Sequence, residues 1–381
     1  MSAGYDIPFN RPSLIGTEQG FVRDAYENGH ISGGGAFTER CEELLRAELH
    51  APRVMLVTSC THALEMCALL LEIRPGDEVI VPAYTFTSTA NAFALRGARI
   101  VFADVRPDTL NIDERDLEAL VTDRTKAIVV VHYAGVACDL QPIVDLASRR
   151  GITLVEDNAH GLFGRYRGRP LGSFGAFATL SFHETKNVTC GEGGALVVND
   201  ARYIERAEII RDKGTDRGRF FRGEVDKYSW VGLGSSYAIS ELLAAFLLAQ
   251  LEERDAVQAA RMRIWHRYAE RLAEWAEEQS FSLPVVPDQC EHSAHMFFLL
   301  APSHAERQRF IAHLLAHRIL AVSHYVPLNV SPKGAEFGGS PGECPVAEDA
   351  GERLVRLPLF TSLGDADQER VIEAVLAFQS A

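Results

Sequence analysis

Short apolar runs alternate with segments of helical periodicity from about residue 54 to residue 198. Several runs are continuous blocks of Val and Ile, of which Ile128 to Val131 is the clearest. Such blocks are typical of strands buried on both faces of a parallel sheet. The strands predicted in this way cover residues 54–57, 78–82, 99–105, 127–132, 153–156, 176–182 and 195–198.

Helices are predicted between these strands, and each is followed by a glycine. Glycine adopts the left-handed backbone conformation that ends many helices. Regular alternation of strands and helices predicts an α/β domain with a mainly parallel central sheet. The helical segments and their following glycines are 61–72 before Pro75-Gly76, 88–96 before Gly97, and 141–150 before Gly151.

The pattern changes after Leu251, where a long charged helix is predicted over 252–279. We therefore expect a large α/β domain over 1–253 and a smaller C-terminal α+β domain over 254–381. Gly and Pro in 338–345 indicate a surface loop. The remaining elements predicted in the C-terminal part are strands at 296–300 and 319–324 and helices at 305–317 and 366–378.

Composition narrows the functional classes. The 381 residues carry a formal net charge of -14 at pH 7, with no run rich in Lys or Arg. Binding to DNA or RNA is therefore not expected. The seven cysteines are scattered without a C-x-x-C pair, which argues against a disulfide framework or a zinc site and favours a reducing cytoplasm.

Two further patterns concern location. Residues 1–11 lack the basic and apolar regions of a secretory signal. The most apolar stretch, 244–251, is too short to span a bilayer. We expect a cytoplasmic protein with no membrane partner.

Lys186 follows the predicted strand 176–182 and precedes the glycine cluster 191–194. Ligands of α/β proteins bind at the carboxyl ends of parallel strands, and a lysine desolvated there becomes a nucleophile. Closely spaced glycines also let another backbone segment approach. A solvated surface lysine is the ordinary alternative to this interpretation.

Asp157 follows Glu156 at the end of the apolar run 152–155. Two acids at the end of a buried strand are costly unless they meet a cation or hydrogen-bond donors. A pyridinium nitrogen is one such partner. An N-cap for the next helix is the alternative role. His160, three residues later, could face the same ligand or be a structural histidine.

Ser59, Cys60 and Thr61 lie between a predicted strand and a predicted helix, where free N–H groups suit a phosphate. Simple N-capping would need the same residues. Phe86 ends a strand and could stack on a flat ring, although core packing is the commoner role. No Walker A, G-x-G-x-x-G, H-E-x-x-H or G-x-S-x-G pattern is placed to support a competing chemistry.

Together these signals comprise a phosphate site, a ring platform, an acid for a ring nitrogen and a lysine. That combination suits pyridoxal 5′-phosphate. The sequence also resembles the DegT/DnrJ/EryC1/StrS family of sugar-nucleotide aminotransferases nearly end to end. The segments that carry this resemblance are Ile7-Pro8-Phe9-Asn10, Pro75-Gly76-Asp77-Glu78-Val79-Ile80 and His324-Tyr325-Val326-Pro327-Leu328.

Within the family, the chain is most similar to transaminases that make dTDP-4-amino-4,6-dideoxygalactose. The stretches that indicate this subgroup are 132–138, 181–187, 220–223 and 226–228. The resemblance implies the aspartate-aminotransferase fold (fold type I). It also implies that Lys186 forms a Schiff base with the cofactor, that Asp157 pairs with the pyridine nitrogen, that His160 lies near the ring hydroxyl and that Phe86 stacks on the ring.

The remaining positions are carried over in the same way. Cys60 and Thr61 match backbone contacts to the phosphate, and Ser181 matches a hydroxyl contact. His324 and Tyr325 fall in a segment that borders the sugar-nucleotide site. Family members are homodimers with sites at the interface, so a homodimer is expected.

Two positions depart from the family pattern. Many relatives bring an Asn from the partner chain to the phosphate, but Ala238 stands at that position. Ser235, Ser236 or a basic residue would have to substitute. The subgroup tends to have His where this chain has Asn329, close to the sugar. Asn329 is therefore a candidate substrate residue that leaves the substrate and the C4 configuration open.

The resemblance implies transfer of an amino group from L-glutamate to C4 of dTDP-4-keto-6-deoxy-D-glucose, giving the amino-galactose or its gluco epimer. A 3-aminotransferase acting on a dTDP-3-keto-6-deoxyhexose is an alternative. Sugar dehydrases of this type have His at the lysine position, so Lys186 argues against them. A non-catalytic sensor of the cofactor or the sugar nucleotide is a further alternative, for which no DNA-binding segment is visible.

Overall fold

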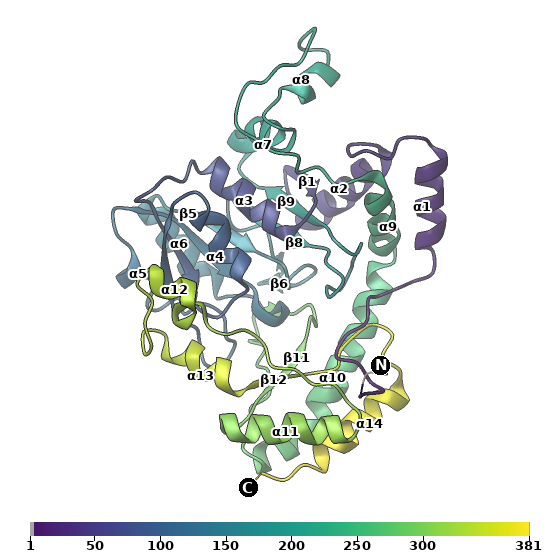
Figure 1. Ribbon diagram of the computed structural model, residues 1–381, viewed down its shortest axis with the longest axis vertical. Helices are drawn as coiled ribbons and strands as arrows, with labels where there is room; N and C mark the ends of the chain where they lie inside the picture. The colour runs from purple at the N-terminus through teal and green to yellow at the C-terminus, as the bar shows by residue number, and fades with distance from the viewer. Residues whose placement is uncertain (1–3, 381) are drawn as a thin grey trace.

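The computed structural model describes residues 4–380, so Met1 to Ala3, part of the stretch predicted to lack a secretory signal, lie outside the described residues. A seven-stranded sheet forms the centre of the molecule (Figure 1). Its strands are β1 (Arg53–Val57), β2 (Glu78–Pro82), β3 (Arg99–Ala103), β4 (Thr125–Val131), β5 (Thr153–Asp157), β8 (Phe177–Ser181) and β9 (Gly194–Val198).

The order across the sheet is β1-β9-β8-β5-β4-β2-β3. Strands β8, β5, β4, β2 and β3 run parallel, whereas β9 runs antiparallel to both β1 and β8. The prediction of a mainly parallel sheet in an α/β protein is confirmed. The antiparallel β9 brings the chain back across the sheet after the segment that carries Lys186.

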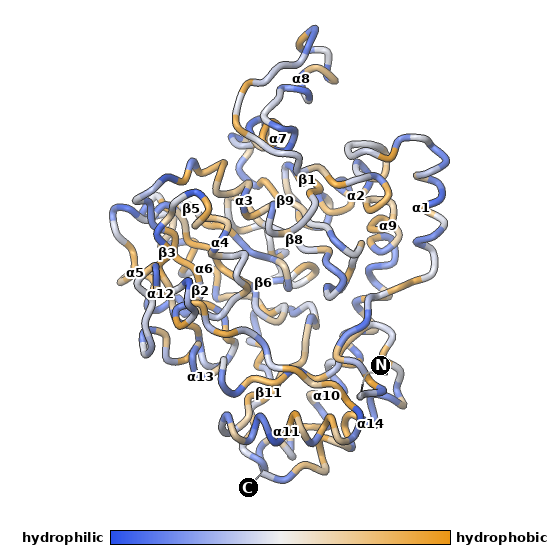
Figure 2. The backbone as a smooth tube through the Cα atoms, in the orientation of Figure 1, coloured by the Kyte–Doolittle hydropathy of each residue, from blue (hydrophilic) through white to orange (hydrophobic). Residues whose placement is uncertain are grey.

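Helices cover both faces of the sheet, which explains the continuous apolar blocks in the sequence. In β4, Val129 packs in one hydrophobic cluster while Ile128 and Val130 pack in another, and all three are fully buried. Apolar residues are correspondingly frequent along the central strands in Figure 2. The helices in this part are α3 (Cys60–Leu70), α4 (Thr87–Ala94), α5 (Leu117–Leu120), α6 (Leu140–Arg150) and α7 (Ile204–Arg211), with 3-10 turns η1 (Tyr133–Gly135) and η2 (Ala201–Tyr203).

The prediction that a glycine ends each helix is only partly confirmed. Helix α6 ends at Gly151, whose φ of 65° is left-handed, as predicted. Helix α3 ends earlier than predicted, and the left-handed residue after it is Glu72, with a φ of 52°. Gly76 instead lies in the turn that leads into β2.

Helices α1 (Glu18–Glu27) and α2 (Ala36–Leu49) pack against α9 (Glu241–Glu252) beside the sheet. Helix α10 (Arg254–Glu278) leads from α9 to the C-terminal part at the bottom of Figure 1. The junction of α9 and α10 coincides with the boundary proposed at residue 253, and the division into two domains stays a prediction.

The C-terminal part has its own core, in which α10, α11 and α14 surround a two-stranded antiparallel sheet of β11 and β12. The loop predicted at 338–345 lies between α12 and α13. The elements not yet introduced are β6 (Arg165–Tyr166), β7 (Arg169–Pro170), α8 (Arg217–Phe221), β10 (Cys290–Glu291), β11 (Phe297–Leu300), α11 (His304–Ala316), η3 (Leu328–Val330), α12 (Pro332–Glu336), α13 (Pro345–Arg353), β12 (Leu354–Leu357) and α14 (Asp365–Leu376).

The strand predicted at 319–324 is wrong. Ile319 pairs with Ile7 and Val322 with Arg356 in isolated bridges only, because the segment crosses from the N-terminal stretch to β12. A segment containing α8, residues 213–233, extends from the rest of the fold at the top of Figure 1 and is called the projecting segment below. Across residues 4–380, no helix combines the length and apolarity needed to cross a membrane.

Candidate active site

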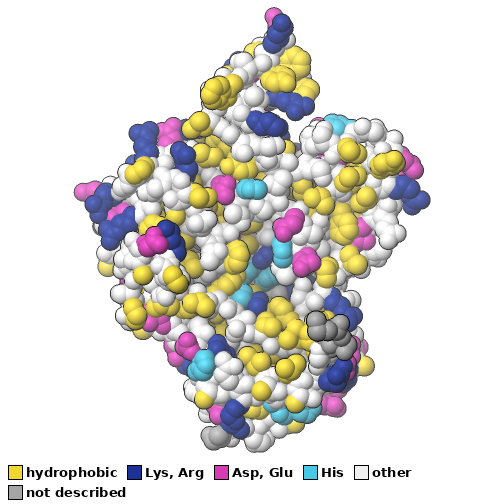
Figure 3. Space-filling model, in the orientation of Figure 1, with side chains coloured by type: hydrophobic (Ala, Val, Ile, Leu, Met, Phe, Trp, Pro, Cys, Tyr) yellow, Lys and Arg dark blue, Asp and Glu magenta, His cyan; other side chains and the backbone are white. Residues whose placement is uncertain are grey.

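A cavity of about 530 Å³ opens where β5 and β8 end and where α3 and α4 begin. In Figure 3, histidine and Lys or Arg side chains gather in the hollow between the upper and lower parts of the molecule. The cavity unites nearly all of the side chains singled out from the sequence. Those that line it are Cys60, Thr61, Phe86, Asp157, His160, Ser181, Lys186, His324 and Tyr325.

Lys186 lies in the turn after β8, where its N–H donates to the carbonyl of His183 at 2.9 Å. Among the described residues, no acidic side chain lies within salt-bridge distance of its ammonium group. Burial, aided by the nearby charge of Arg356 and opposed by Cys60 and Asp157, lowers the pKa of Lys186 to about 8. About a tenth of this lysine is therefore neutral and nucleophilic at pH 7, far more than for an ordinary lysine.

Asp157 ends β5 and is 5% exposed. Its Oδ2 accepts a 2.7 Å hydrogen bond from the hydroxyl of Thr89, and its Oδ1 accepts one of 3.2 Å from the N–H of Ala159. Burial raises the pKa of Asp157, and these two hydrogen bonds oppose that shift. A cationic N–H at the cavity would favour the ionised carboxylate.

The neighbouring carboxylate, Glu156, lies on the opposite face of β5 because successive side chains of a strand alternate between faces. Glu156 is fully buried and therefore needs several hydrogen-bond donors. Of the two adjacent acids at the end of β5, Glu156 is thus structural and Asp157 faces the cavity. The donors to Glu156 are the N–H groups of Gly172, Phe174 and Gly175, at 2.8, 2.6 and 2.7 Å, and the Nε2 of His132, at 3.0 Å.

The start of α3 offers a site for an anion. Ser59 caps this helix by accepting the N–H of His62 at 3.1 Å. The N–H groups of Cys60 and Thr61 bond to no acceptor among residues 4–380. The predicted close approach of the glycine cluster is confirmed, because a Cβ on Gly194 would overlap the backbone of Ser59 and Cys60.

Three histidines, His160, His295 and His324, line the cavity together with Lys186. The ring of His160 stacks on that of His295 at 4.2 Å, and His324 stacks on Tyr325 at 3.6 Å. Burial, together with the charges of Lys186 and Arg356, holds the pKa of His160 well below its usual range. His160 is therefore neutral near pH 7, and its buried Nδ1 has no partner among the described residues.

Phe86 stands just before α4, with its side chain 55% exposed and its ring 6.2 Å from that of Tyr325. This exposure leaves a ring face open toward the cavity region. Ser181 lines the cavity at the end of β8. Ser235, Ser236 and Ala238 do not line it within their own chain, and a contact from a partner chain stays a prediction.

Asn329 is not brought to the cavity. Its side chain is fully buried and donates to the carbonyl of Ser340 at 3.2 Å and to the carboxylate of Glu348 at 2.7 Å. This arrangement ties η3 to the start of α13, so direct contact with a substrate is not supported by the structure.

The structure also adds side chains that sequence reasoning missed. Thr89 orients Asp157, and the hydroxyl of Ser88 lies 2.7 Å from that of Thr61. Arg356 and His295 line the cavity as well. A lone cation in the otherwise apolar Leu354–Leu357 stretch was a signal that could have identified Arg356. The two hydroxyls carry no comparable signal in the sequence.

These residues fit pyridoxal phosphate. The N–H groups at the start of α3 suit a phosphate, and Asp157 suits a protonated ring nitrogen. The unpartnered Nδ1 of His160 is a buried polar atom that a ring substituent would satisfy. Lys186 has the low pKa that covalent attachment to an aldehyde requires.

Comparisons with known proteins agree with this fit. The spore coat polysaccharide biosynthesis protein SpsC of Bacillus subtilis is 34% identical over 97% of this chain and 96% of its own. The GDP-perosamine synthase of Escherichia coli O157:H7 is 31% identical over 98% of this chain and 99% of its own. The solved structure of Spr1654 from Streptococcus pneumoniae in its PLP form matches with a TM-score of 0.89 and 28% identity, covering 97% of this chain and 98% of that one.

Fold and cavity thus define a pyridoxal-phosphate-dependent aminotransferase of fold type I. Within that class, the chain belongs to the DegT/DnrJ/EryC1/StrS aminotransferase family, whose family model matches residues 12–376. The enzyme is accordingly a sugar aminotransferase. The relatives do not single out the dTDP-4-amino-4,6-dideoxygalactose transaminases, so that closer assignment does not follow from the comparisons.

Proposed function

We propose that this enzyme transfers the amino group of L-glutamate to C4 of dTDP-4-keto-6-deoxy-D-glucose. The observation that carries the proposal is that Lys186 and Asp157 line the same cavity as His324 and Tyr325. The cavity size falls within the range of small-molecule sites. The subgroup motifs around Lys186 favour the dTDP-linked substrate.

The chain's own residues have defined tasks in this reaction. Bound pyridoxal phosphate supplies an electron sink for the carbanion chemistry. The amine of Lys186 removes the proton from the α-carbon of the donor amino acid and later delivers a proton to C4 of the sugar. Asp157 keeps the ring nitrogen protonated, and the start of α3 holds the phosphate. The face on which Lys186 delivers the proton decides between galacto and gluco products.

The test is incubation of the holoenzyme with L-glutamate and dTDP-4-keto-6-deoxyglucose, followed by NMR of the product. An amino group at C4 supports the proposal, and its coupling constants give the configuration. An amine at C3 after addition of a 3-keto isomer would favour the alternative regiochemistry. No aminated product from any keto-sugar, with Lys186→Ala as the blank, would refute the proposal.

A GDP-linked 4-keto-6-deoxyhexose is the second candidate substrate, favoured by the likeness to a GDP-perosamine synthase. Parallel assays with dTDP-linked and GDP-linked sugars at equal concentration separate the two. A higher kcat/KM for the GDP-linked sugar would replace the first proposal with the second.

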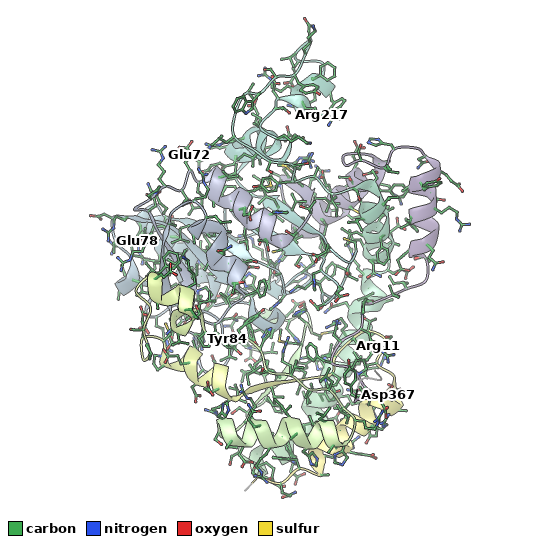
Figure 4. All side chains as sticks on the ribbon, in the orientation of Figure 1. Arg11, Glu72, Glu78, Tyr84, Arg217 and Asp367 are labelled. Carbon is green, nitrogen blue, oxygen red and sulfur yellow. The ribbon has the colours of Figure 1, made fainter. Side chains whose placement is uncertain are left out.

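We further propose that the enzyme works as a homodimer. The projecting segment carries exposed apolar side chains, among them Phe221 at 68%, Trp230 at 79% and Leu233 at 65%. Arg217, labelled in Figure 4, lies on the same segment, well away from the centre of the molecule. Exposed apolar groups gathered on one projection are typical of a protein–protein contact. A second copy of this chain is the expected partner.

A further inference from the structure

Arg356 occupies an unusual position for a cation. It lies in β12 between Val355 and Leu357, which are both fully buried, and its own side chain borders the cavity. It is the one arginine among the described residues that line this cavity. A partly buried charge of this kind usually has an acidic partner, because desolvation of an unpaired charge is costly.

No such partner is present among residues 4–380. The Nε and Nη2 groups of Arg356 donate to one neutral acceptor, the carbonyl of Ser323, at 3.3 and 3.0 Å. The guanidinium lies 4.4 Å from the ring centroid of Phe9, which also lines the cavity. A guanidinium has five N–H donors, so most of this one's capacity is unused. The group is held in place by its neighbours yet lacks a counter-ion.

The charge of Arg356 acts on the reacting part of the cavity. Burial lowers the pKa of Arg356 itself. Burial is the main cause of the lowered pKa of Lys186, and the charge of Arg356 contributes to it. The same charge also lowers the pKa values of His160 and His324. Arg356 is therefore close enough to the lysine amine to affect its protonation.

Aromatic rings enclose this region. Tyr84 lies near the centre of the molecule in Figure 4, and its ring packs against Tyr133 at 5.4 Å and Tyr325 at 5.7 Å. Arg356 lowers the pKa of Tyr84 in opposition to burial, which places the guanidinium near this cluster. Ion pairs formed beside such apolar rings are screened less than ion pairs in water.

Two anionic groups enter this cavity in the proposed reaction, and their distances from the reacting atom differ. In an amino acid, the α-carboxylate is bonded to the carbon that loses its proton. In a nucleotide sugar, the diphosphate is attached at C1, across the ring from C4. An anion site beside Lys186 therefore suits the donor carboxylate, whose planar shape matches the guanidinium fork.

We propose that Arg356 binds a carboxylate of the amino-acid donor and so orients its α-carbon toward Lys186. This inference rests on the proposed use of L-glutamate. It gives the donor carboxylate a cationic partner within this chain.

The test uses the holoenzyme with L-glutamate alone, so that it is independent of the sugar. Release of 2-oxoglutarate in a single turnover is followed for Arg356→Met and Arg356→Lys. We expect the glutamate concentration at half-maximal rate to rise about 10- to 100-fold in Arg356→Met, since one charge-assisted hydrogen-bonded pair is lost. Arg356→Lys should recover part of this loss because it keeps the charge without the fork.

Binding of glutarate, an unreactive dicarboxylate, is measured by calorimetry on the same proteins and should weaken in parallel. Arg169→Met is the matched control, since Arg169 also lies over a ring, that of Phe174 at 4.3 Å, and bonds to a serine carbonyl away from the cavity. Retained cofactor absorbance and melting temperature show that each variant is folded.

The second half-reaction, in which the keto-sugar is aminated, tests whether Arg356 instead binds the diphosphate of the sugar nucleotide. Protein loaded with pyridoxamine 5′-phosphate is mixed with the keto-sugar nucleotide, and Arg356→Met should lose much less rate here than with glutamate, because only its effect on the pKa of Lys186 is common to both arms. Loss in this arm with normal glutamate turnover would overturn the proposal in favour of a phosphate contact. Equal loss in both arms, or loss in neither, would overturn it as well. If wild type fails with every sugar but turns over glutamate, the substrate proposal alone is wrong.

Discussion

The hydroxyl of Thr89 donates a 2.7 Å hydrogen bond to Oδ2 of Asp157, and the same hydroxyl lies 2.9 Å from that of Thr85. Because Thr89 gives its proton to the carboxylate, Thr85 must be the donor in the second bond. Thr85, just before α4, and Thr89, in its first turn, thus orient an acid at the end of β5. Asp157 is held toward the cavity by the protein itself, independently of a ligand.

Replacing Asp157 with Asn should preserve the fold and lower kcat by about 10²- to 10³-fold, because an amide cannot hold the ring nitrogen in its protonated form. Single-turnover reaction with L-glutamate measures this loss, and circular dichroism checks the fold. Near-normal turnover in Asp157→Asn would remove Asp157 from its proposed role.

Thr89→Val is a milder probe of the same carboxylate. It deletes one hydrogen bond, worth about 0.5–1.5 kcal/mol, so a loss of about 2- to 10-fold is expected. An effect as large as that of Asp157→Asn would show that Thr89 does more than orient the acid.

The low pKa of Lys186 predicts how cofactor attachment depends on pH. Only the neutral amine reacts with an aldehyde, so the rate of attachment to the apoenzyme should rise about tenfold per pH unit and level off above about 8. Borohydride trapping at timed intervals, with mass spectrometry of the Lys186 peptide, gives this profile. In Arg356→Met the midpoint should move upward, since a neighbouring positive charge is removed. A rate that still climbs at pH 10 would contradict the lowered pKa.

Glu156 should matter for stability rather than chemistry. In Glu156→Ala, three backbone N–H groups and His132 lose their acceptor inside the protein. The expected loss is about 3–5 kcal/mol in the free energy of unfolding. Urea titration measures it, with the exposed Glu274→Ala as the matched control. Unchanged stability in Glu156→Ala would mean that other groups satisfy these donors.

The dimer proposal makes Trp230 a sensitive position. A carboxylate introduced by Trp230→Glu would be desolvated in an apolar interface, so sedimentation should show dissociation to monomers at micromolar concentration. Leu315→Glu on α11, 45% exposed at the other end of the molecule, should remain dimeric. A wild-type protein that sediments as a fully active monomer would end the dimer proposal.

The elements around the cavity could be predicted because their signals are local. Apolar blocks marked β2, β4 and β5 within a few residues, and the carboxyl ends of parallel strands necessarily share one edge of a sheet. That rule was enough to bring Asp157 and the segment after β8 together. The antiparallel direction of β9 could not be predicted, because the hydrophobic pattern of a buried strand is the same in either direction.

The predictions that failed depended on distant contacts. The apolar residues at 319–324 resemble a strand, but their partners at Ile7 and Arg356 allow only single bridges. Asn329 lies near the predicted sugar site in sequence, yet its amide is committed to Glu348. Thr89 and Arg356 were missed because their roles depend on groups far away along the chain.

The cavity walls span almost the whole chain, from Phe9 to Leu359. Protein synthesis proceeds from the N-terminus, and early segments fold first. A nascent chain can therefore present Lys186 and Asp157 well before Arg356 and Leu359 exist to shield them. A chain that stops short of β12 lacks part of the cavity wall, so the site is complete only once β12 has joined the fold.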